Sequence, residues 1–279
     1  MKKTFDLLSP CSDFIFKNIF GKSSHKRALI SLINAILAGK PHIKDLTIEN
    51  PDIPKDLPKG KSVRLDIRAT ADDNTKLGIE IQCCDDGRIM NRSAFYQCRM
   101  MPNDLKEGEE FDALPNMISI WIANYDETKR QYHTHEALFT FQETPLDPAE
   151  VATEKFRTII VELPKVDIKQ ANIKDMFRVW MYFLRNPEKI PAEFLDVPEV
   201  EEAMNELQHV SQNPEMRKIY EERLRWQDNE RNLRAHHYNK GRMEEKREAA
   251  LSMLTDGMSS SSISKYTGLS EKEINSLKQ

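Results

Sequence analysis

The sequence predicts an α/β protein in which helices flank a mixed β-sheet and a helical region forms the C-terminal part. Two segments of alternating apolar and polar residues surround a turn at residues 71–75, which is the pattern of a β-hairpin. Residues 115–124 form a nearly continuous apolar run of strand length, typical of a strand buried on both faces. From residue 187 onward, prolines are followed by highly charged segments with helical spacing.

Two helices are expected before the hairpin, over residues 12–20 and 23–38, because apolar residues recur there at helical spacing. Asp13 and Lys17 are four residues apart and therefore share the polar side of the first helix. From the residues alone, a surface ion pair is the favoured interpretation of this pair. Residues 43–49 predict a short strand, and the proline-rich residues 50–60 predict a loop.

The hairpin has a register that can be tested from the sequence. When Asp66 stands opposite Glu80, apolar residues of both arms meet apolar partners. The expected apolar pairs are Leu65 with Ile81, Ile67 with Ile79, and Ala69 with Leu77. One face of the hairpin then packs into a core, and the other face presents Arg64, Asp66, Glu80 and Gln82 together.

The opposed acids Asp66 and Glu80 predict a metal site. Side chains at directly paired strand positions have Cβ atoms about 5 Å apart, so two carboxylates there repel one another unless a cation neutralises them. Mg²⁺ typically binds one or two carboxylates together with phosphate oxygens of a substrate. A site of that kind activates water for phosphodiester hydrolysis.

A helix over residues 88–105 follows the hairpin, with Arg88, Arg92, Tyr96 and Arg99 along one side. This side is either an ordinary solvated stripe or a phosphate-facing row, since arginine holds phosphate with forked donors. Further strands are expected at 132–141 and 156–163, and a further helix at 173–185.

Prolines at 187, 191 and 198 mark a domain edge, which divides the chain into residues 1–186 and 187–279. Helices are expected at 199–212, 214–237 and 243–255, with a break at Gly241. The mixed-charge helix 214–237 is either solvated or part of an oligomer seam. Residues 257–279 have the pattern of a helix-turn-helix with a capping box at Ser270, and bind either DNA or another subunit.

Composition limits the class of protein. The net charge of −4 gives no support for nucleic-acid binding by the whole molecule, so a nuclease would need a local basic patch. The four cysteines lack metal-binding spacing, which favours reduced cytosolic thiols. No apolar run follows Met1, and no stretch reaches the length of a membrane span, so we expect a cytoplasmic protein without a membrane partner.

The segment from Asp66 through a short turn to Glu80-Ile81-Gln82 resembles the PD-(D/E)XK nuclease signature, with glutamine in the usual lysine place. Together with residues 13–21 and 92–96, it resembles the Rpn family of recombination-promoting nucleases, which are also described as transposases. The resemblance covers about residues 9–125 and returns from about residue 239.

The resemblance implies a restriction-endonuclease-like core and a Mg²⁺- or Mn²⁺-dependent endonuclease that acts on double-stranded DNA, in recombination or phage defence. The implied catalytic residues are Asp66, Glu80 and Gln82. The implied metal ligands are Asp66, Glu80 and the Ile81 carbonyl. The implied supporting residues are Asp13 and Lys17. The expected nucleic-acid contacts are Arg88, Arg92 and Tyr96.

Two further expectations concern assembly and an alternative function. Cutting both strands of a duplex requires two active sites, so we expect a homodimer or a higher homo-oligomer. Gln82 carries no charge and can position water only by hydrogen bonds. The alternative is therefore a non-catalytic, DNA-associated or regulatory assembly protein that retains the nuclease fold.

Overall fold

The computed structural model describes residues 6–38, 41–53, 63–84, 87–101, 107–126, 134–141 and 150–277. The chain divides into two compact units, Met1–Tyr220 and Glu221–Gln279. The predicted domain edge at residue 187 lies inside the first unit. Helix α5 (Pro198–Gln212) contributes Val200, Leu207 and other buried side chains to the hydrophobic core of this unit. This core, called the main core below, also contains Phe16, Leu32 and Ile79.

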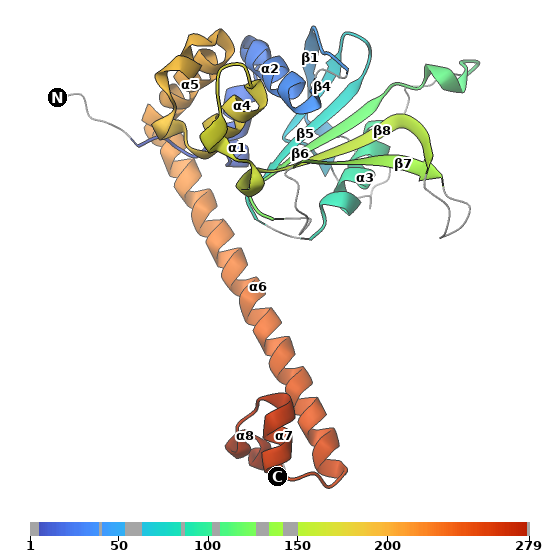
Figure 1. Ribbon diagram of the computed structural model, residues 1–279, viewed down its shortest axis with the longest axis vertical. Helices are drawn as coiled ribbons and strands as arrows, with labels where there is room; N and C mark the ends of the chain where they lie inside the picture. The colour runs from blue at the N-terminus through green and yellow to red at the C-terminus, as the bar shows by residue number, and fades with distance from the viewer. Residues whose placement is uncertain are drawn as a thin grey trace, which may run out of the picture. The chain divides into compact units, whose positions relative to one another are not determined.

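The first unit is built on a six-stranded mixed sheet with the strand order β1-β4-β5-β6-β8-β7 (Figure 1). Its strands are β1 (Leu46–Glu49), β4 (Ile67–Ala71), β5 (Lys76–Gln82), β6 (Met117–Ala123), β7 (Thr134–Phe141) and β8 (Glu150–Glu162). β5, β6 and β8 run parallel, and the other pairs are antiparallel. The short strands β2 (Asp52–Ile53) and β3 (Val63–Arg64) form a separate pair. The predicted mixed sheet is confirmed.

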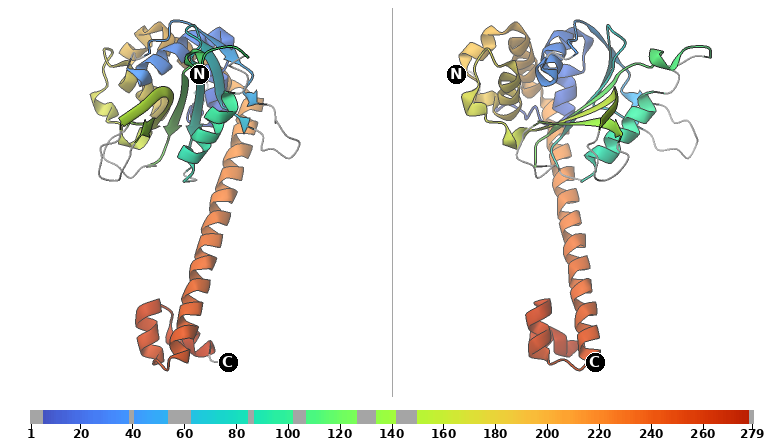
Figure 2. Two further views of the ribbon diagram at one scale, coloured as in Figure 1. Left: turned by 90° about the vertical axis from the view of Figure 1, so that its right-hand side faces the viewer. Right: turned by 45° about the vertical axis from the view of Figure 1, so that its right-hand side comes forward.

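Helices cover both faces of the sheet. α1 (Asp13–Phe20), α2 (Lys26–Leu37), α4 (Met176–Arg185) and α5 lie on one face, and α3 (Ile89–Met100) lies on the other (Figures 1 and 2). Within β6, Ile118 and Ile120 belong to the main core, whereas Trp121 packs on the α3 side. The expectation that this strand is buried on both faces is confirmed, and it follows from the alternation of side chains along a strand.

The remaining helical turns are short 3₁₀ segments. They are η1 (Ser23–His25), η2 (Phe111–Ala113), η3 (Leu163–Lys165), η4 (Ile168–Gln170), η5 (Pro187–Lys189) and η6 (Ala192–Asp196).

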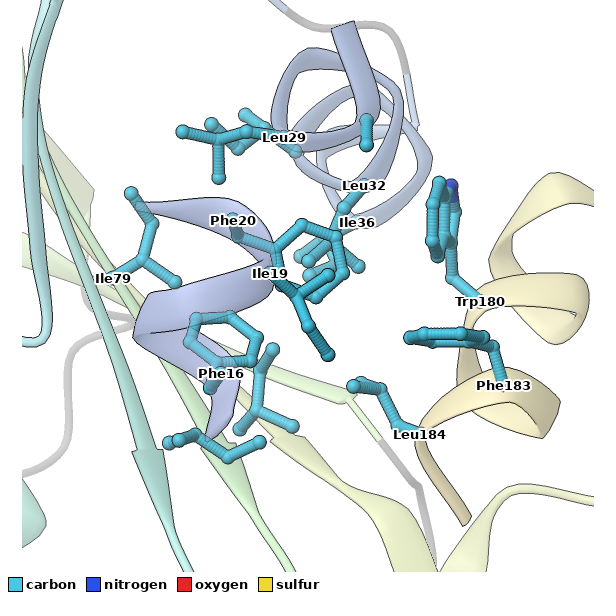
Figure 3. Packing of buried hydrophobic residues seen from close by; sticks show 14 of the residues in the cluster. Phe16, Ile19, Phe20, Leu29, Leu32, Ile36, Ile79, Trp180, Phe183 and Leu184 are labelled. Carbon is cyan, nitrogen blue, oxygen red and sulfur yellow. The ribbon is translucent and has the colours of Figure 1, made fainter. Parts of the chain in front are cut away.

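An aromatic cluster anchors α1 to α4 in the main core. Figure 3 shows Phe16 and Phe20 of α1 beside Trp180 and Phe183 of α4. The Phe20 ring lies 5.6 Å from the Trp180 ring and 6.2 Å from the Phe183 ring, both in edge-on geometry. Burial of this side of α1 directs the opposite, polar side of the helix, which carries Lys17, away from the aromatic cluster.

The hairpin has the predicted pairs Ile67–Ile79 and Ala69–Leu77, but its first arm is interrupted. Asp66 lies in a bend, and the N–H of Leu65 bonds to the carbonyl of Pro51 instead of joining the ladder with β5. The expected pairing of Leu65 with Ile81 is therefore wrong, because the alternation of side chains restarts at Ile67.

Because of this interruption, two side chains of the first arm do not lie where the hairpin pattern predicts. Leu65 packs with Met100 of α3 and Met117 of β6 in a separate cluster. The predicted place of Arg64 beside the acids is wrong, since its exposed side chain pairs with Asp52, with 3.5 Å between Nε and Oδ1.

The second unit contains α7 (Ser260–Thr267), α8 (Glu271–Ser276) and most of α6 (Pro214–Thr255). The predicted break at Gly241 is wrong, since α6 continues through it; glycine inside a helix costs only about 1 kcal/mol relative to alanine. The capping box at Ser270 is present, with the Ser270 hydroxyl and the Glu273 side chain bonding reciprocally. Across the described part of the chain, none of the helices has the length and apolar character needed to span a bilayer.

Candidate active site

Asp66 and Glu80 lie in direct contact where β4 separates from β5. The backbone N–H of Asp66 donates to Oε1 of Glu80 at 2.7 Å. The N–H of Ile81 donates to Oδ2 of Asp66 at 2.9 Å. The two acids that the sequence places opposite one another are therefore neighbours in the structure.

The bend at Asp66 explains how these groups meet. Because β4 begins only at Ile67, the edge of β5 at Ile81 has no backbone partner from β4, and the Asp66 carboxylate accepts that N–H instead. Within a strand, the N–H and C=O of one residue point to the same side. The Ile81 carbonyl therefore lies on the same edge as the Asp66 carboxylate, so three oxygen donors, two carboxylates and one carbonyl, come together.

Cations approach the two acids from opposite faces of the sheet. Lys17 of α1 places Nζ 2.8 Å from Oδ1 of Asp66. Arg92 of α3 places Nη2 3.3 Å from Oε2 of Glu80. The acid side chains are only 10% and 5% exposed, respectively. The pair is thus enclosed, with one cationic side chain on each side of it.

Burial sets the protonation of the acid pair. Desolvation raises the pKa of Asp66, against the opposing effect of the Lys17 ammonium and the Ile81 N–H, and the Asp13 carboxylate raises this pKa further. The pKa of Glu80 lies well above its usual range, first because of burial and then because of the Asp66 carboxylate. Burial therefore shifts both acids toward their protonated forms.

Replacing Glu80 with glutamine is expected to stabilise the metal-free protein at pH 8. Below the ordinary glutamate pKa of about 4.3, Glu80 is protonated in both the folded and the unfolded state, and its burial carries no charge penalty. As the pH rises through the raised folded-state pKa, the folded protein loses that advantage over the unfolded chain. We expect Glu80→Gln to exceed wild type in free energy of unfolding by at least about 1 kcal/mol at pH 8.

Urea denaturation at pH 8 and pH 4.5 measures this effect, and the difference between the two proteins should shrink at the lower pH. Glu107→Gln, at an exposed turn residue, is the control and should show no such pH dependence. An equal difference between Glu80→Gln and wild type at both pH values would contradict the prediction.

Arg92 is held at the acid pair by a set of contacts. Its Nη1 donates to Oε1 of Gln82 at 2.6 Å, and its Nη2 lies 3.3 Å from the hydroxyl of Tyr96. Its guanidinium also lies over the Trp121 ring, 4.8 Å from the centroid. Gln82 in turn donates from Nε2 to the carbonyl of Cys84 at 2.9 Å. Arg92, Tyr96 and Gln82 thus form one connected group next to Glu80.

The remaining predicted site residues lie at helix starts. Asp13 is the first residue of α1, one turn before Lys17, and its charge acts on Asp66. Arg88 is exposed at the N-cap of α3, one turn before Arg92. Sequence reasoning missed Trp121, which it treated as a core residue only. The register of parallel strands pairs Trp121 with Glu80, and that register is not visible in the sequence.

The donor set suits a hard divalent cation. No group of three or more His, Cys, Asp or Glu side chains close enough to hold a metal occurs among the described residues. A metal here would bind the two carboxylates and backbone oxygen, and Mg²⁺ is commonly held by one or two carboxylates with the remaining positions filled by water and phosphate. Burial is the first cause of the raised pKa of both acids, and a bound cation would oppose that effect.

Comparison with protein families agrees with this geometry. Residues 10–236 match the model of a PD-(D/E)XK nuclease family transposase. Residues 243–279 match the C-terminal HTH domain of the Rpn/YhgA-like nuclease family. No curated protein and no solved structure matches the chain. The resemblance to the Rpn family is therefore confirmed, and the chain belongs to the PD-(D/E)XK nuclease family of transposases, with an Rpn/YhgA-like helix-turn-helix domain at its C-terminal end.

Proposed function

We propose that this protein is a Mg²⁺- or Mn²⁺-dependent endonuclease that hydrolyses phosphodiester bonds in double-stranded DNA. The observation that carries the proposal is the enclosed contact between Asp66 and Glu80, with a cation on each side. Two acids with raised pKa values in a nuclease-family fold suit metal binding better than a purely structural role. Asp66, Glu80 and the Ile81 carbonyl are the proposed metal ligands.

Hydrolysis of the phosphodiester changes no oxidation state and therefore requires no redox partner. The oxygen of a water molecule forms a bond to phosphorus, and the bond from phosphorus to the leaving sugar oxygen breaks. The water loses one proton to solvent, and the leaving oxygen takes up one proton. A bound divalent cation supplies Lewis-acid polarisation of the phosphate and lowers the pKa of bound water.

Arg92 is the proposed phosphate contact. Its planar guanidinium carries five N–H donors, and forked donors suit phosphate oxygens. Gln82 and Tyr96 hold this guanidinium beside Glu80, and the Trp121 ring supports its face. Arg88, exposed one turn earlier on α3, extends the same cationic side toward the DNA backbone. This local basic surface answers the objection raised by the net charge of −4.

The proposal extends to DNA binding by the second unit and to self-association. The match of residues 243–279 to a helix-turn-helix domain supports a DNA contact by α7 and α8. Trp226, Leu233 and Tyr238 are exposed apolar residues on α6, and a second copy of the chain is the proposed partner for this helix. A homodimer would bring two active sites to one duplex.

Metal removal tests the proposed function. Purified full-length protein with supercoiled plasmid should yield nicked and linear DNA in Mg²⁺ or Mn²⁺, because the acids then acquire the neutralising ion that hydrolysis requires. EDTA should abolish cleavage, and excess Mg²⁺ should restore it. Gel electrophoresis of the plasmid measures the products, and a mock purification without the protein is the control.

Intact plasmid in both metals would contradict the proposed nuclease. If the same protein still shifts duplex DNA in a gel under those conditions, the non-catalytic DNA-associated function would replace it.

A further inference from the structure

We propose that Lys17 supplies the cation at the attacking water that the PD-(D/E)XK signature usually takes from a lysine at the position of Gln82. The inference rests on the proposed nuclease function and assigns to Lys17, on a different element, a role in the same site. Gln82 cannot supply this cation. An amide carries no charge, and both ends of the Gln82 amide are already bonded, to Arg92 and to the Cys84 carbonyl.

Lys17 lies where a cation could hold a water molecule beside the acid pair. Its Nζ lies 2.8 Å from Oδ1 of Asp66, and its side chain is 27% exposed, so the ammonium contacts a buried acid while part of the side chain reaches solvent. An ammonium has three N–H donors, and the Asp66 contact uses one of them. The other donors have the chemistry needed to hold a water molecule next to the Asp66 carboxylate.

The position of Lys17 is set by the packing of α1. Phe16 and Phe20 are fully buried in the main core, so α1 cannot rotate without exposing aromatic surface. The helix therefore delivers Lys17 to the acid pair from the face opposite α3. This delivery uses no side chain at position 82, so a lysine there is not required to place a cation at Asp66.

Arg92 is a poorer candidate for the same role. Its guanidinium contacts Glu80, Gln82 and Tyr96, and lies over an indole ring. A planar fork fits a phosphate, whereas the compact point charge of an ammonium fits a single water oxygen. The two cations therefore have different roles: Arg92 contacts the phosphate, and Lys17 contacts the attacking water.

In the proposed step, Lys17 donates a hydrogen bond to the water oxygen as that oxygen bonds to phosphorus. The water proton passes to solvent, the bond to the leaving sugar oxygen breaks, and that oxygen is protonated. Lys17 stays charged throughout, so the step requires no change in its protonation.

Four variants test the inference: Lys17→Met, Lys17→Arg, the double variant Lys17→Met with Gln82→Lys, and Lys22→Met as the control. Lys22 lies just beyond the same helix and pairs with Glu206, away from the acid pair. Cleavage of plasmid in Mg²⁺ is measured beside Mn²⁺ binding by calorimetry without DNA. Circular dichroism verifies that each variant is folded.

We expect Lys17→Met to lower kcat/KM by about 10²-fold or more. Lys17→Arg should lower it by at least about 10-fold, because arginine keeps the charge but not the compact ammonium. Mn²⁺ affinity of Lys17→Arg should stay within about fivefold of wild type, which separates catalysis from metal binding. The double variant should recover at least about 10-fold over Lys17→Met, because the lysine returns to its usual position, and Lys22→Met should match wild type.

The outcomes separate this inference from the proposed function. If wild type cleaves and both Lys17 single variants cleave within threefold of it, the Lys17 role is overturned, whereas the proposed nuclease function is retained. The same role is overturned if Mn²⁺ affinity of Lys17→Arg falls in parallel with cleavage. If wild type itself does not cleave, the proposed function fails first.

Discussion

Replacing Asp66 with asparagine is expected to reduce metal-dependent DNA cleavage on the order of 10³-fold, which corresponds to about 4 kcal/mol of lost transition-state stabilisation. Asparagine has nearly the same shape, and its amide oxygen can still accept the Ile81 N–H. What it lacks is the negative charge that would bind the metal and that pairs with Lys17. The loss should therefore arise from the missing charge and not from a collapsed site.

Plasmid cleavage and Mn²⁺ calorimetry measure the two parts of this effect, and both should fall together in Asp66→Asn. The matched control is Asp52→Asn, an identical chemical change at an exposed aspartate that pairs only at the surface with Arg64. Wild-type cleavage in Asp66→Asn would refute Asp66 as a metal ligand. A comparable loss in Asp52→Asn would show that the effect is not specific to the acid pair.

Replacing Phe20 with alanine is expected to lower the free energy of unfolding by about 3–5 kcal/mol. Phe20 is fully buried and contacts Phe16, Trp180 and Phe183, so truncation leaves a cavity between α1 and α4 that the surrounding rings cannot fill. Because α1 also carries Lys17, this packing connects the stability of the core to the geometry of the acid pair.

Urea denaturation followed by circular dichroism measures the loss. Phe111→Ala is the matched control: Phe111 is 86% exposed in η2, and its truncation should change stability by no more than about 0.5 kcal/mol. A loss below about 1 kcal/mol in Phe20→Ala would mean that the aromatic cluster can repack around the cavity.

Local patterns were sufficient for much of the fold. The alternation on each side of residues 71–75 determined the pairing of Ile67 with Ile79, since a slip by one residue would turn apolar side chains to the wrong face. The apolar run at 115–124 identified a strand covered on both faces, and helical spacing identified α1 before its partners were known. The family resemblance rested on short segments at residues 13–21, 66–82 and 92–96, and the family match confirms it.

Contacts between residues far apart in the sequence determined the remaining features of the fold and the site. The bend at Asp66, the transfer of Leu65 to the α3 side and the placement of Trp121 beside Glu80 depend on neighbours far away in the chain. The sequence by itself determined the hairpin, the strand at 115–124 and the helix that becomes α1, because these follow from spacing within one segment. It also predicted that Asp66 and Glu80 meet, but the bend that brings them into contact goes with the distant hydrogen bond from Leu65 to Pro51. Only the tertiary structure decided that Lys17 and Arg92 enclose the acids from opposite faces, because packing of α1 and α3 against the sheet sets those contacts.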